Sequence, residues 1–419
     1  MAAVIELDVT RPWEPSDGAR PRRRWRHWVS AGLVLAAVLA LFPAGSGPDP
    51  LAPLFEIEGG TDSLLTDGSS VFVALPRPGH TVVSAYRATD GRQRWSTSYG
   101  EETRLVTARD GLLVLTTFRP QEIVAIDTVS GKVVWRLQRY SPVVASVPGL
   151  DVLVVGQAGR PGADPGMVGI DIRTGRVRWS SAQPMTATST VSDFKGWAEL
   201  DADGTLRVYD IGSGAPVRSV KLDVAARVHA FNVAGDLLIA YVAGDSGASV
   251  FDLTTGRRLW RVETAGRPEP LWPCGTALCH LTFDRPGSQG LAGLDPRTGR
   301  RLWWLDSWGF TQVGDRHLVA TLGNERGPSV LVDAASGAVV QRLGRWRILA
   351  ARDWPRFVVW QTDPYDRTTL FARVDGAAGT VTVFGRLKEV YEYPRCDVSG
   401  AVLVCGGMFR ISVWRLPPP

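Results

Sequence analysis

The sequence predicts an all-β protein, a β-propeller built of four-stranded blades and preceded by one transmembrane helix. Two observations predict the propeller: one short phrase recurs eight times, and short apolar segments surround every copy. The copies lie 38 to 44 residues apart, which is the spacing expected of propeller blades. A third observation, one apolar segment near the N-terminus, predicts the helix.

The repeated phrase is Asp-x-x-Ser/Thr-Gly-x-x-x-Trp, with an apolar residue just before the aspartate. Close copies are AIDTVSGKVVW at 125–135, GIDIRTGRVRW at 169–179, VFDLTTGRRLW at 250–260 and GLDPRTGRRLW at 293–303. Weaker copies occupy 85–95, 208–218, 331–341 and 371–381. An apolar run followed by a turn of Asp and Gly predicts a β-hairpin. Two more strands precede each hairpin, for example at 104–111 and 112–118, so one unit holds four strands.

The turn inside each phrase has a defined chemistry. The aspartate carboxylate can accept main-chain N–H groups of the turn, and the glycine supplies the positive φ that closes it. The aspartates expected in this role are Asp127, Asp171, Asp210, Asp252, Asp295 and Asp333. The glycines are Gly91, Gly131, Gly175, Gly214, Gly256, Gly299 and Gly337. Arg87 replaces the aspartate in the first copy, so that turn is expected to close differently.

Five copies end in a tryptophan: Trp95, Trp135, Trp179, Trp260 and Trp303. Arg218, Gln341 and Val383 occupy this position in the other copies. A large ring at a fixed point of each blade is expected to pack between neighbouring blades. The alternative is a stack of tryptophans that grips a ligand.

The phrase resembles the tryptophan-docking motif of the pyrroloquinoline quinone (PQQ) repeat propellers, the quinoprotein alcohol dehydrogenase-like superfamily. The resemblance covers residues 55–419. That superfamily holds quinoprotein alcohol dehydrogenases and non-enzymatic members such as the outer-membrane-protein assembly lipoprotein. In the family each tryptophan docks on the next blade, so the resemblance implies this role for the five tryptophans.

The number of blades stays open between two values. Eight units run from about residue 61 to 385, and a partial unit follows at 395–416. Residues 54–60 are expected to supply the missing strand of this unit, as is usual where such rings close. Eight blades are the family norm and are favoured here, while the raw count of units allows nine.

Basic residues around the apolar segment predict its orientation. Residues 29–42 carry no charge, five arginines lie between Arg20 and Arg26, and no Lys or Arg follows until Arg77. The positive-inside rule therefore places the N-terminus in the cytoplasm and the propeller outside the plasma membrane. The expected organisation is a basic tail at 1–26, a signal-anchor helix at 27–46, a linker at 47–54 and the propeller at 55–419. A cleaved signal peptide is the alternative.

The balance of charges after residue 28 excludes a binding surface for nucleic acid. Beyond residue 28 there are 41 basic and 38 acidic residues, without the excess of positive charge that phosphate binding needs. The arginine run is instead expected to serve topology and to contact anionic lipid.

The four cysteines form two local pairs, Cys274 with Cys279 and Cys396 with Cys405. Each pair is expected on adjacent strands around a tight turn, within reach of a disulfide. An exported domain would oxidise both pairs. A zinc site and unpaired thiols remain as alternatives, although the spacing is not Cys-x-x-Cys.

No catalytic residue, cofactor-binding residue or metal ligand can be assigned. The chain lacks the adjacent cysteine pair that the quinoprotein enzymes use, and its five histidines are scattered. Residues 244–247 spell Gly-Asp-Ser-Gly without the context of a serine protease. Residues 201–204 suggest half of a calcium loop, but its glutamate is missing. The chain is therefore predicted not to be an enzyme and to need no cofactor.

Three functions remain after these exclusions. The favoured one is a monomeric, membrane-anchored propeller that acts as a non-catalytic binding or assembly scaffold for an unknown protein or cell-envelope ligand. The second is a degenerate quinoprotein that binds PQQ or another small ligand in the funnel. The third is an extracellular sensor that signals through its tail. Loops at 76–80, 159–166, 284–290 and 363–367 are the candidate contact segments.

Overall fold

The fold is taken from a computed structural model of the chain. It describes residues 53–60, 63–138, 140–146, 150–157, 167–181, 187–190, 196–201, 203–223, 228–242, 247–263, 271–285, 288–313, 316–324, 326–350, 356–363, 368–387, 395–406 and 409–416. The chain divides into two compact units, Met1–Asp49 and Pro50–Pro419, and all described residues belong to the second. The predicted tail, the signal-anchor helix and most of the linker lie outside the described residues. Within those residues, no helix has the length and apolar character needed to cross a bilayer.

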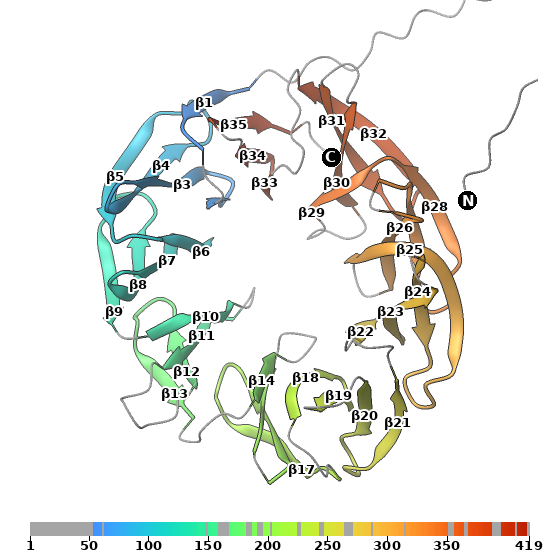
Figure 1. The fold of residues 1–419 in the computed structure, drawn as a ribbon. Coiled ribbons are helices and arrows are strands. Elements are labelled where there is room, and N and C mark those ends of the chain that lie inside the picture. Colours follow the sequence, from blue (N-terminus) through green and yellow to red (C-terminus); the bar gives the residue numbers. More distant parts are fainter. Residues whose placement is uncertain are drawn as a thin grey trace, which may run out of the picture. The chain divides into compact units, whose positions relative to one another are not determined.

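The all-β prediction is confirmed, because every element of the described part of the chain is a strand. The second unit is a ring of antiparallel sheets that the chain visits in order (Figure 1). We number the four-stranded units of the ring as repeats 1 to 9.

The first five repeats are separate four-stranded sheets. Repeat 1 comprises β2 (Leu64–Thr66), β3 (Ser70–Arg77), β4 (His80–Arg87) and β5 (Gln93–Tyr99). Repeat 2 comprises β6 (Arg104–Arg109), β7 (Leu112–Phe118), β8 (Gln121–Asp127) and β9 (Val133–Gln138). Repeat 3 comprises β10 (Tyr140–Ser146), β11 (Val152–Gln157), β12 (Met167–Asp171) and β13 (Val177–Ser180). Repeat 4 comprises β14 (Ala187–Thr190), β15 (Gly196–Leu200), β16 (Thr205–Asp210) and β17 (Pro216–Lys221). Repeat 5 comprises β18 (Val228–Ala234), β19 (Leu237–Val242), β20 (Ala248–Asp252) and β21 (Arg258–Val262).

The remaining strands complete the ring. Repeats 6 and 7 share one seven-stranded sheet made of β22 (Leu271–Cys274), β23 (Ala277–Arg285), β24 (Ser288–Leu294), β25 (Arg301–Val313), β26 (His317–Leu322), β27 (Ser329–Asp333) and β28 (Val339–Gly344). Repeat 8 comprises β29 (Arg347–Ala350), β30 (Arg356–Asp363), β31 (Thr368–Asp375) and β32 (Thr380–Leu387). Repeat 9 comprises β33 (Arg395–Ser399), β34 (Val402–Gly406), β35 (Arg410–Arg415) and β1 (Phe55–Glu58).

The long strand β25 joins repeats 6 and 7. Its first half pairs with β24 as far as Asp306, and its second half pairs with β26 from Ser307 onward. It is therefore the outermost strand of one repeat and the innermost strand of the next. Counted in both repeats, it gives nine four-stranded units in the described residues. The favoured count of eight blades is thus not confirmed.

The first strand of the described chain closes the ring. β1 pairs with β35, so that Ile57 lies opposite Ile411 and Phe55 opposite Val413. The expectation that residues 54–60 complete the last unit is confirmed. A second link joins the two ends, because the main-chain N–H of Thr66 in repeat 1 donates to the buried Asp397 carboxylate of repeat 9 over 2.9 Å. Closure thus uses contacts between residues more than 330 positions apart.

The core lies between neighbouring sheets. Strand β7 shows why its sequence is continuously apolar: Leu113 and Leu115 pack against Phe72 and Ala74 of repeat 1, while Val114 packs against Leu153 of repeat 3. A strand that is buried on both faces has no solvent side, so it does not alternate between apolar and polar residues. Only the outermost strands are open to solvent along the circumference of the ring.

Replacing Ile57 tests how strongly the closing strand holds the ring. Ile57 is buried with Ile411 and Val413, so Ile57→Ala should lower the free energy of unfolding by about 2–4 kcal/mol. Glu58→Ala on the same strand is the matched control, and its exposed side chain should matter by less than about 0.5 kcal/mol. Urea denaturation followed by tryptophan fluorescence measures both. Equal losses in the two variants would contradict a structural role for this strand.

Candidate functional site

The turns of the repeated phrase are closed by their own aspartates. The Asp127 carboxylate accepts the main-chain N–H groups of Val129 (3.2 Å) and Ser130 (2.7 Å) and the Ser130 hydroxyl (2.7 Å). The Gly131 N–H donates to the Asp127 carbonyl over 2.9 Å, with φ of 72° at the glycine. The Ser130 hydrogen bonds hold the pKa of the Asp127 carboxyl below its usual range. Equivalent carboxylate bonds occur at Asp171, Asp210, Asp252, Asp295 and Asp333.

The turn of repeat 1 keeps the main-chain hydrogen bond of the other turns but uses a different carboxylate. The Gly91 N–H still donates to the carbonyl of residue 87 over 2.9 Å. Because Arg87 has no acceptor, Asp90 takes over and accepts from the Arg92 N–H and the Arg87 guanidinium, each over 3.1 Å. The turn of repeat 8 lies in the predicted weaker copy at 371–381, for which the sequence predicted no aspartate: Asp375 accepts from Ala377 and Ala378, and Gly379 has φ of 68°. Its signal in the sequence is Asp-x-x-x-Gly with an alanine in place of Ser or Thr.

Each of the five motif tryptophans lies on the turn of the following repeat. The indole N–H of Trp95 donates to the Thr128 carbonyl over 3.0 Å, and that of Trp135 donates to the Ile172 carbonyl over 2.8 Å. The corresponding acceptors are Ile211 for Trp179, Pro296 for Trp260 and Ala334 for Trp303. The ring covers the turn glycine so closely that a Cβ on Gly131 would lie 2.6 Å from Cγ of Trp95. Glycine is therefore needed at this point both for its positive φ and for the approach of the indole.

A β-bulge precedes each docking position. In repeat 2, Ala125 pairs with Trp135 and Ile126 pairs with Val133, so Val134 has no partner. The same residue is skipped in repeats 1 and 3 to 7. A bulge bends its strand and redirects the next side chain, and here that side chain points at the next repeat. In repeat 8 the bulge lies beyond Val383 instead.

The three phrase turns that no tryptophan covers, those of repeats 1, 5 and 8, have different surroundings. Phe55 of β1 covers Gly91, so a phenyl ring docks repeat 9 on repeat 1. At the junction of repeats 4 and 5 the chain itself covers the turn, because the Asp223 N–H donates to the Gly256 carbonyl over 3.2 Å. At the junction of repeats 7 and 8 no atom of the described residues lies within 4 Å of a Cβ built on Gly379. Phe55 was missed because it precedes every copy of the phrase and belongs to the last repeat only through β1.

A buried carboxyl group lies between repeats 3 and 4. The rings of Trp179, Trp197 and Tyr209 stack, with centroids 5.2 and 4.3 Å apart. Beyond this stack Glu199 is buried and accepts the Ser181 hydroxyl. Burial raises the pKa of Glu199, and burial together with this neighbouring carboxyl raises the pKa of Tyr209 to about 12.

A buried imidazole lies between repeats 5 and 6. His280 pairs with Leu271 on one side and with Ala292 on the other, and both neighbours belong to the core of this junction. Its Nε2 atom is buried and has no hydrogen-bond partner among the described residues. Burial therefore lowers the pKa of His280 to about 4, since the charged ring would have to leave water.

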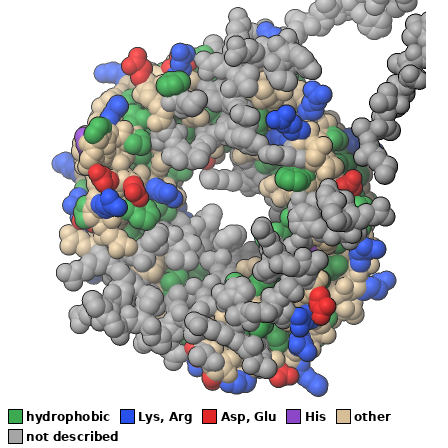
Figure 2. All heavy atoms as spheres, viewed as in Figure 1, with side chains coloured by type: hydrophobic (Ala, Val, Ile, Leu, Met, Phe, Trp, Pro, Cys, Tyr) green, Lys and Arg blue, Asp and Glu red, His purple; other side chains and the backbone are tan. Residues whose placement is uncertain are grey.

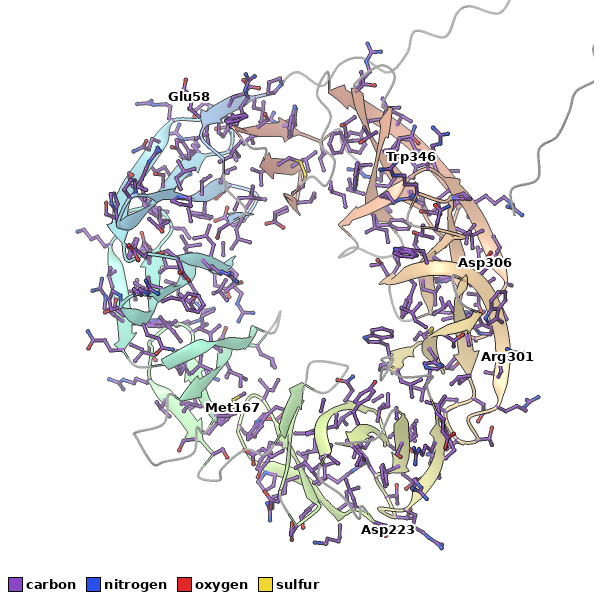
Figure 3. The ribbon with its side chains drawn as sticks, in the orientation of Figure 1. Glu58, Met167, Asp223, Arg301, Asp306 and Trp346 are labelled. Carbon is purple, nitrogen blue, oxygen red and sulfur yellow. A yellow bond between two sulfur atoms is a disulfide. The ribbon has the colours of Figure 1, made fainter. Side chains whose placement is uncertain are left out.

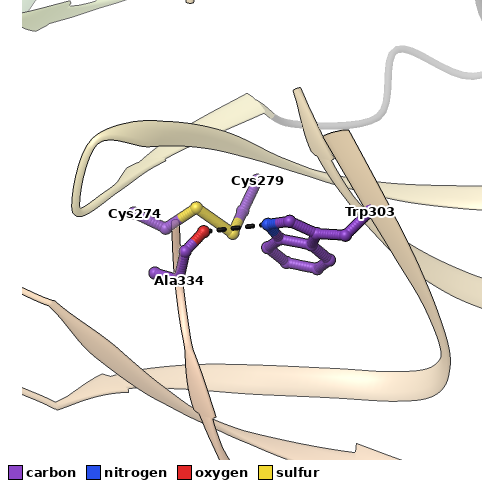
Figure 4. The surroundings of a disulfide bond; sticks show 4 residues. All are labelled: Cys274, Cys279, Trp303 and Ala334. Atoms are coloured by element: carbon purple, nitrogen blue, oxygen red, sulfur yellow. Dashed lines mark hydrogen bonds between the residues drawn. A yellow bond between two sulfur atoms is a disulfide. The ribbon is translucent and has the colours of Figure 1, made fainter. Parts of the chain in front are cut away.

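Both cysteine pairs form disulfides. Cys274 and Cys279 are bonded and lie in one buried cluster with Trp303, whose indole N–H reaches the Ala334 carbonyl (Figure 4). Cys396 and Cys405 are bonded across β33 and β34, where they pair directly. Cys274 instead pairs with Ala277, so the first disulfide crosses its hairpin diagonally.

The ring has two faces of different character. The hairpin turns of the phrase lie on one face, where Arg173 reaches Asp110 and Asp151 over 3.8 and 3.5 Å, and Arg297 pairs with Asp236 and Asp252. Charged side chains are spread around the circumference, and an opening lies at the centre (Figure 2). The opposite face carries the hairpin between β3 and β4. The 76–80 loop there is a hairpin in which Arg77 pairs with His80, while 159–166, 286–287 and 364–367 lie outside the described residues.

The remaining candidate sites are turns or fall outside the described residues. In the candidate calcium loop, between β15 and β16, the Gly204 N–H donates to the Asp201 carbonyl over 2.9 Å. Residues 244–246 of the Gly-Asp-Ser-Gly segment are not among the described residues. In the part of the chain that the structure describes, no three His, Cys, Asp or Glu residues are grouped to hold a metal ion.

Comparison with known proteins identifies a family model that matches most of the chain. The model is described as outer membrane protein assembly factor BamB and matches residues 22–196 and 198–375. No curated protein sequence matches the chain. Among solved structures, BamB from Moraxella catarrhalis is 17% identical, with a TM-score of 0.43 over 87% of this chain and 100% of that chain. The computationally designed Ika8 protein is 17% identical, with a TM-score of 0.46 over 74% and 95% of the two chains. A europium-containing methanol dehydrogenase is 12% identical, with a TM-score of 0.39 over 87% and 93%.

Substitution of Trp135 separates the packing of the indole from its hydrogen bond. Trp135→Ala should lower the free energy of unfolding by about 3–5 kcal/mol. Trp135→Phe keeps a ring over Gly175 and should lose only about 1–3 kcal/mol, because the Ile172 carbonyl is left without its donor. The bulge residue next to it supplies the control, since Val134→Ala changes an exposed side chain. If Trp135→Ala were no more harmful than this control in urea denaturation, docking would not hold the repeats together.

The buried imidazole predicts sensitivity to acid. The folded-state pKa of about 4 for His280 lies below the unfolded value of about 6.5. Its contribution is therefore fully present above about pH 6.5 and is lost as the pH falls through 4, on the order of 3 kcal/mol in total. His280→Leu should flatten this part of the curve of unfolding free energy against pH, while His80→Leu in the outer hairpin should not. A curve that stays unchanged in His280→Leu would refute this assignment.

Proposed function

This chain belongs to the PQQ-like repeat β-propeller family of the outer membrane protein assembly factor BamB, and on that premise we propose that it is a protein-binding scaffold of the cell envelope. In this proposal the ring binds other proteins and catalyses no reaction. The family description supports an assembly role.

The observation that carries the proposal is that the polar groups of the motif residues form hydrogen bonds within the ring. The aspartates accept turn N–H groups of their own repeat, and the five indoles donate to carbonyl groups of the next repeat. These groups face the interior of the ring wall and build it. The surfaces left for function are therefore the loops of the two faces and the outer strands, which suit recognition of a macromolecule.

We also propose where the protein resides. Residues 1–26 would be a cytoplasmic tail, 27–46 a single membrane-spanning helix and 47–54 a linker to an extracytoplasmic ring at 55–419. The arginine asymmetry of the N-terminus supports this orientation. The two disulfides support an oxidising compartment for the ring.

The way the ring closes supports a proposal for its number of blades and its oligomeric state. We propose nine blades, because β25 serves two four-stranded units. We further propose a monomer, because β1 of the same chain completes the last blade. In a monomer both faces and the whole circumference remain open to partners.

Photo-cross-linking from the two faces of the full-length chain in its host tests the proposal. A cross-linking residue at Val129 reports on the face of the phrase turns, and one at Phe409 reports on the opposite face, where this side chain is 83% exposed. We expect one of the two positions to capture a defined envelope protein and the other to serve as its control. External protease should cleave the ring in cells without their wall. Protection of the ring, or saturable heat release when PQQ is titrated into the chain, would contradict the scaffold proposal.

A further inference from the structure

Two neighbouring outer strands carry the same exposed sequence. The hexapeptide Thr-Gly-Arg-Arg-Leu-Trp occurs at 255–260, at the start of β21, and again at 298–303, at the start of β25. Its exposed residues form what we call the Arg-Leu surface: Arg257, Arg258, Leu259, Arg300, Arg301 and Leu302. Arg301 and Asp306 mark this part of the circumference in Figure 3.

The arginines of this surface are not held in close ion pairs, and Arg300 interacts with the Asp295 carboxylate only at longer range. None of the four forms an ion pair within 4 Å in the described residues. Two carboxylates of the neighbouring turns, Asp252 and Asp236, pair with Arg297. Asp295 accepts three hydrogen bonds from residues of its own turn. Four cations are thus available to an anionic partner.

Apolar side chains lie among these cations. Leu259 and Leu302 are the bulge residues of their strands, and they are 36% and 40% exposed. Trp304 on the same strand as Leu302 is 38% exposed. A partner that contacts both kinds of side chain must carry negative charge and apolar groups together, which excludes an inorganic anion.

The open main-chain edges of the two strands place a further requirement on the partner. β21 is the last strand of its sheet, and the first half of β25 pairs only with β24 in the described residues. An open edge can bind an extended peptide through main-chain hydrogen bonds. A lipid surface offers anions and apolar chains but has no strand to pair with such an edge. A second copy of this chain would bring the same cations and be repelled.

We propose that the Arg-Leu surface binds an extended acidic segment of another protein, in which acidic and apolar side chains alternate along the strand. Alternate side chains of a strand point to opposite sides, so its carboxylates reach the arginines while its apolar residues reach Leu259 or Leu302. The inference rests on the proposed scaffold role and adds the chemistry of the partner.

The test measures binding of labelled peptides to the purified full-length chain by fluorescence anisotropy. The probe is a decapeptide of alternating Glu and Val, compared with alternating Glu and Ser and with alternating Lys and Val. We expect saturable binding of the Glu-Val peptide that is about tenfold weaker in Arg258→Glu/Arg301→Glu. Leu259→Ser/Leu302→Ser should weaken it about threefold to tenfold.

Repeat 1 provides the matched control. Arg92 and Arg94 occupy the equivalent strand start, and the bulge residue there is Arg94 rather than an apolar residue. Arg92→Glu/Arg94→Glu should therefore change the affinity less than about twofold. Circular dichroism and thermal melts check that all variants are folded.

Several outcomes overturn the inference. These are no saturable binding at about 1 mM peptide, equal binding of the Glu-Ser peptide, an equal loss in the repeat 1 control, or tighter binding to phosphatidylglycerol vesicles with the same loss in Arg258→Glu/Arg301→Glu. If cross-linking in the host still captures a defined protein, the scaffold role stands and only this surface is wrong.

Discussion

The ring depends on one contact that is repeated around it, an aromatic ring packed on the glycine turn of the following repeat. The indole has an apolar body that fills the junction and an N–H group that needs an acceptor once buried. The carbonyl after the turn aspartate meets this need at 2.8 to 3.0 Å in five junctions. At these junctions one repeat contributes the indole, and the next repeat contributes the carbonyl group that accepts its buried N–H.

The junctions that depart from this pattern show what the contact requires. In the five tryptophan junctions three features coincide: a glycine at positive φ, a bulge that turns the outer strand, and a ring at the position after the bulge. Repeat 9 covers Gly91 with Phe55, although the phrase is absent there and β1 pairs with β35 without a bulge. Repeat 7 has the bulge but carries Gln341, and the glycine that follows stays uncovered. The ring tolerates such junctions because neighbouring sheets also share an apolar core, as Phe357 and Leu331 do between repeats 7 and 8.

Burial also determines which titratable side chains of the ring affect its stability. Glu199 and His280 lie in two different junctions, and burial disfavours the charged form of each. Glu199 loses stabilising effect as the pH rises, whereas His280 loses it as the pH falls. The exposed arginines of the outer strands stay in water, so their charges carry no desolvation penalty and remain accessible to a partner. The interior therefore limits the pH range of the fold, while the proposed binding role falls to the circumference and the loops.

The sequence alone determined the repeat length, the all-β class, the position of the hairpins and the chemistry of their turns, because these follow from residues close together in the chain. It also indicated that residues 54–60 would join the last repeat. Only the tertiary structure decided the strand register, and with it the bulge before each docking residue, the role of Phe55 and the use of β25 by two repeats. These depend on pairing between strands and on contacts between repeats, which local spacing does not encode. The pairing of Arg297 with two aspartates of the preceding repeat likewise arises only when adjacent repeats pack side by side.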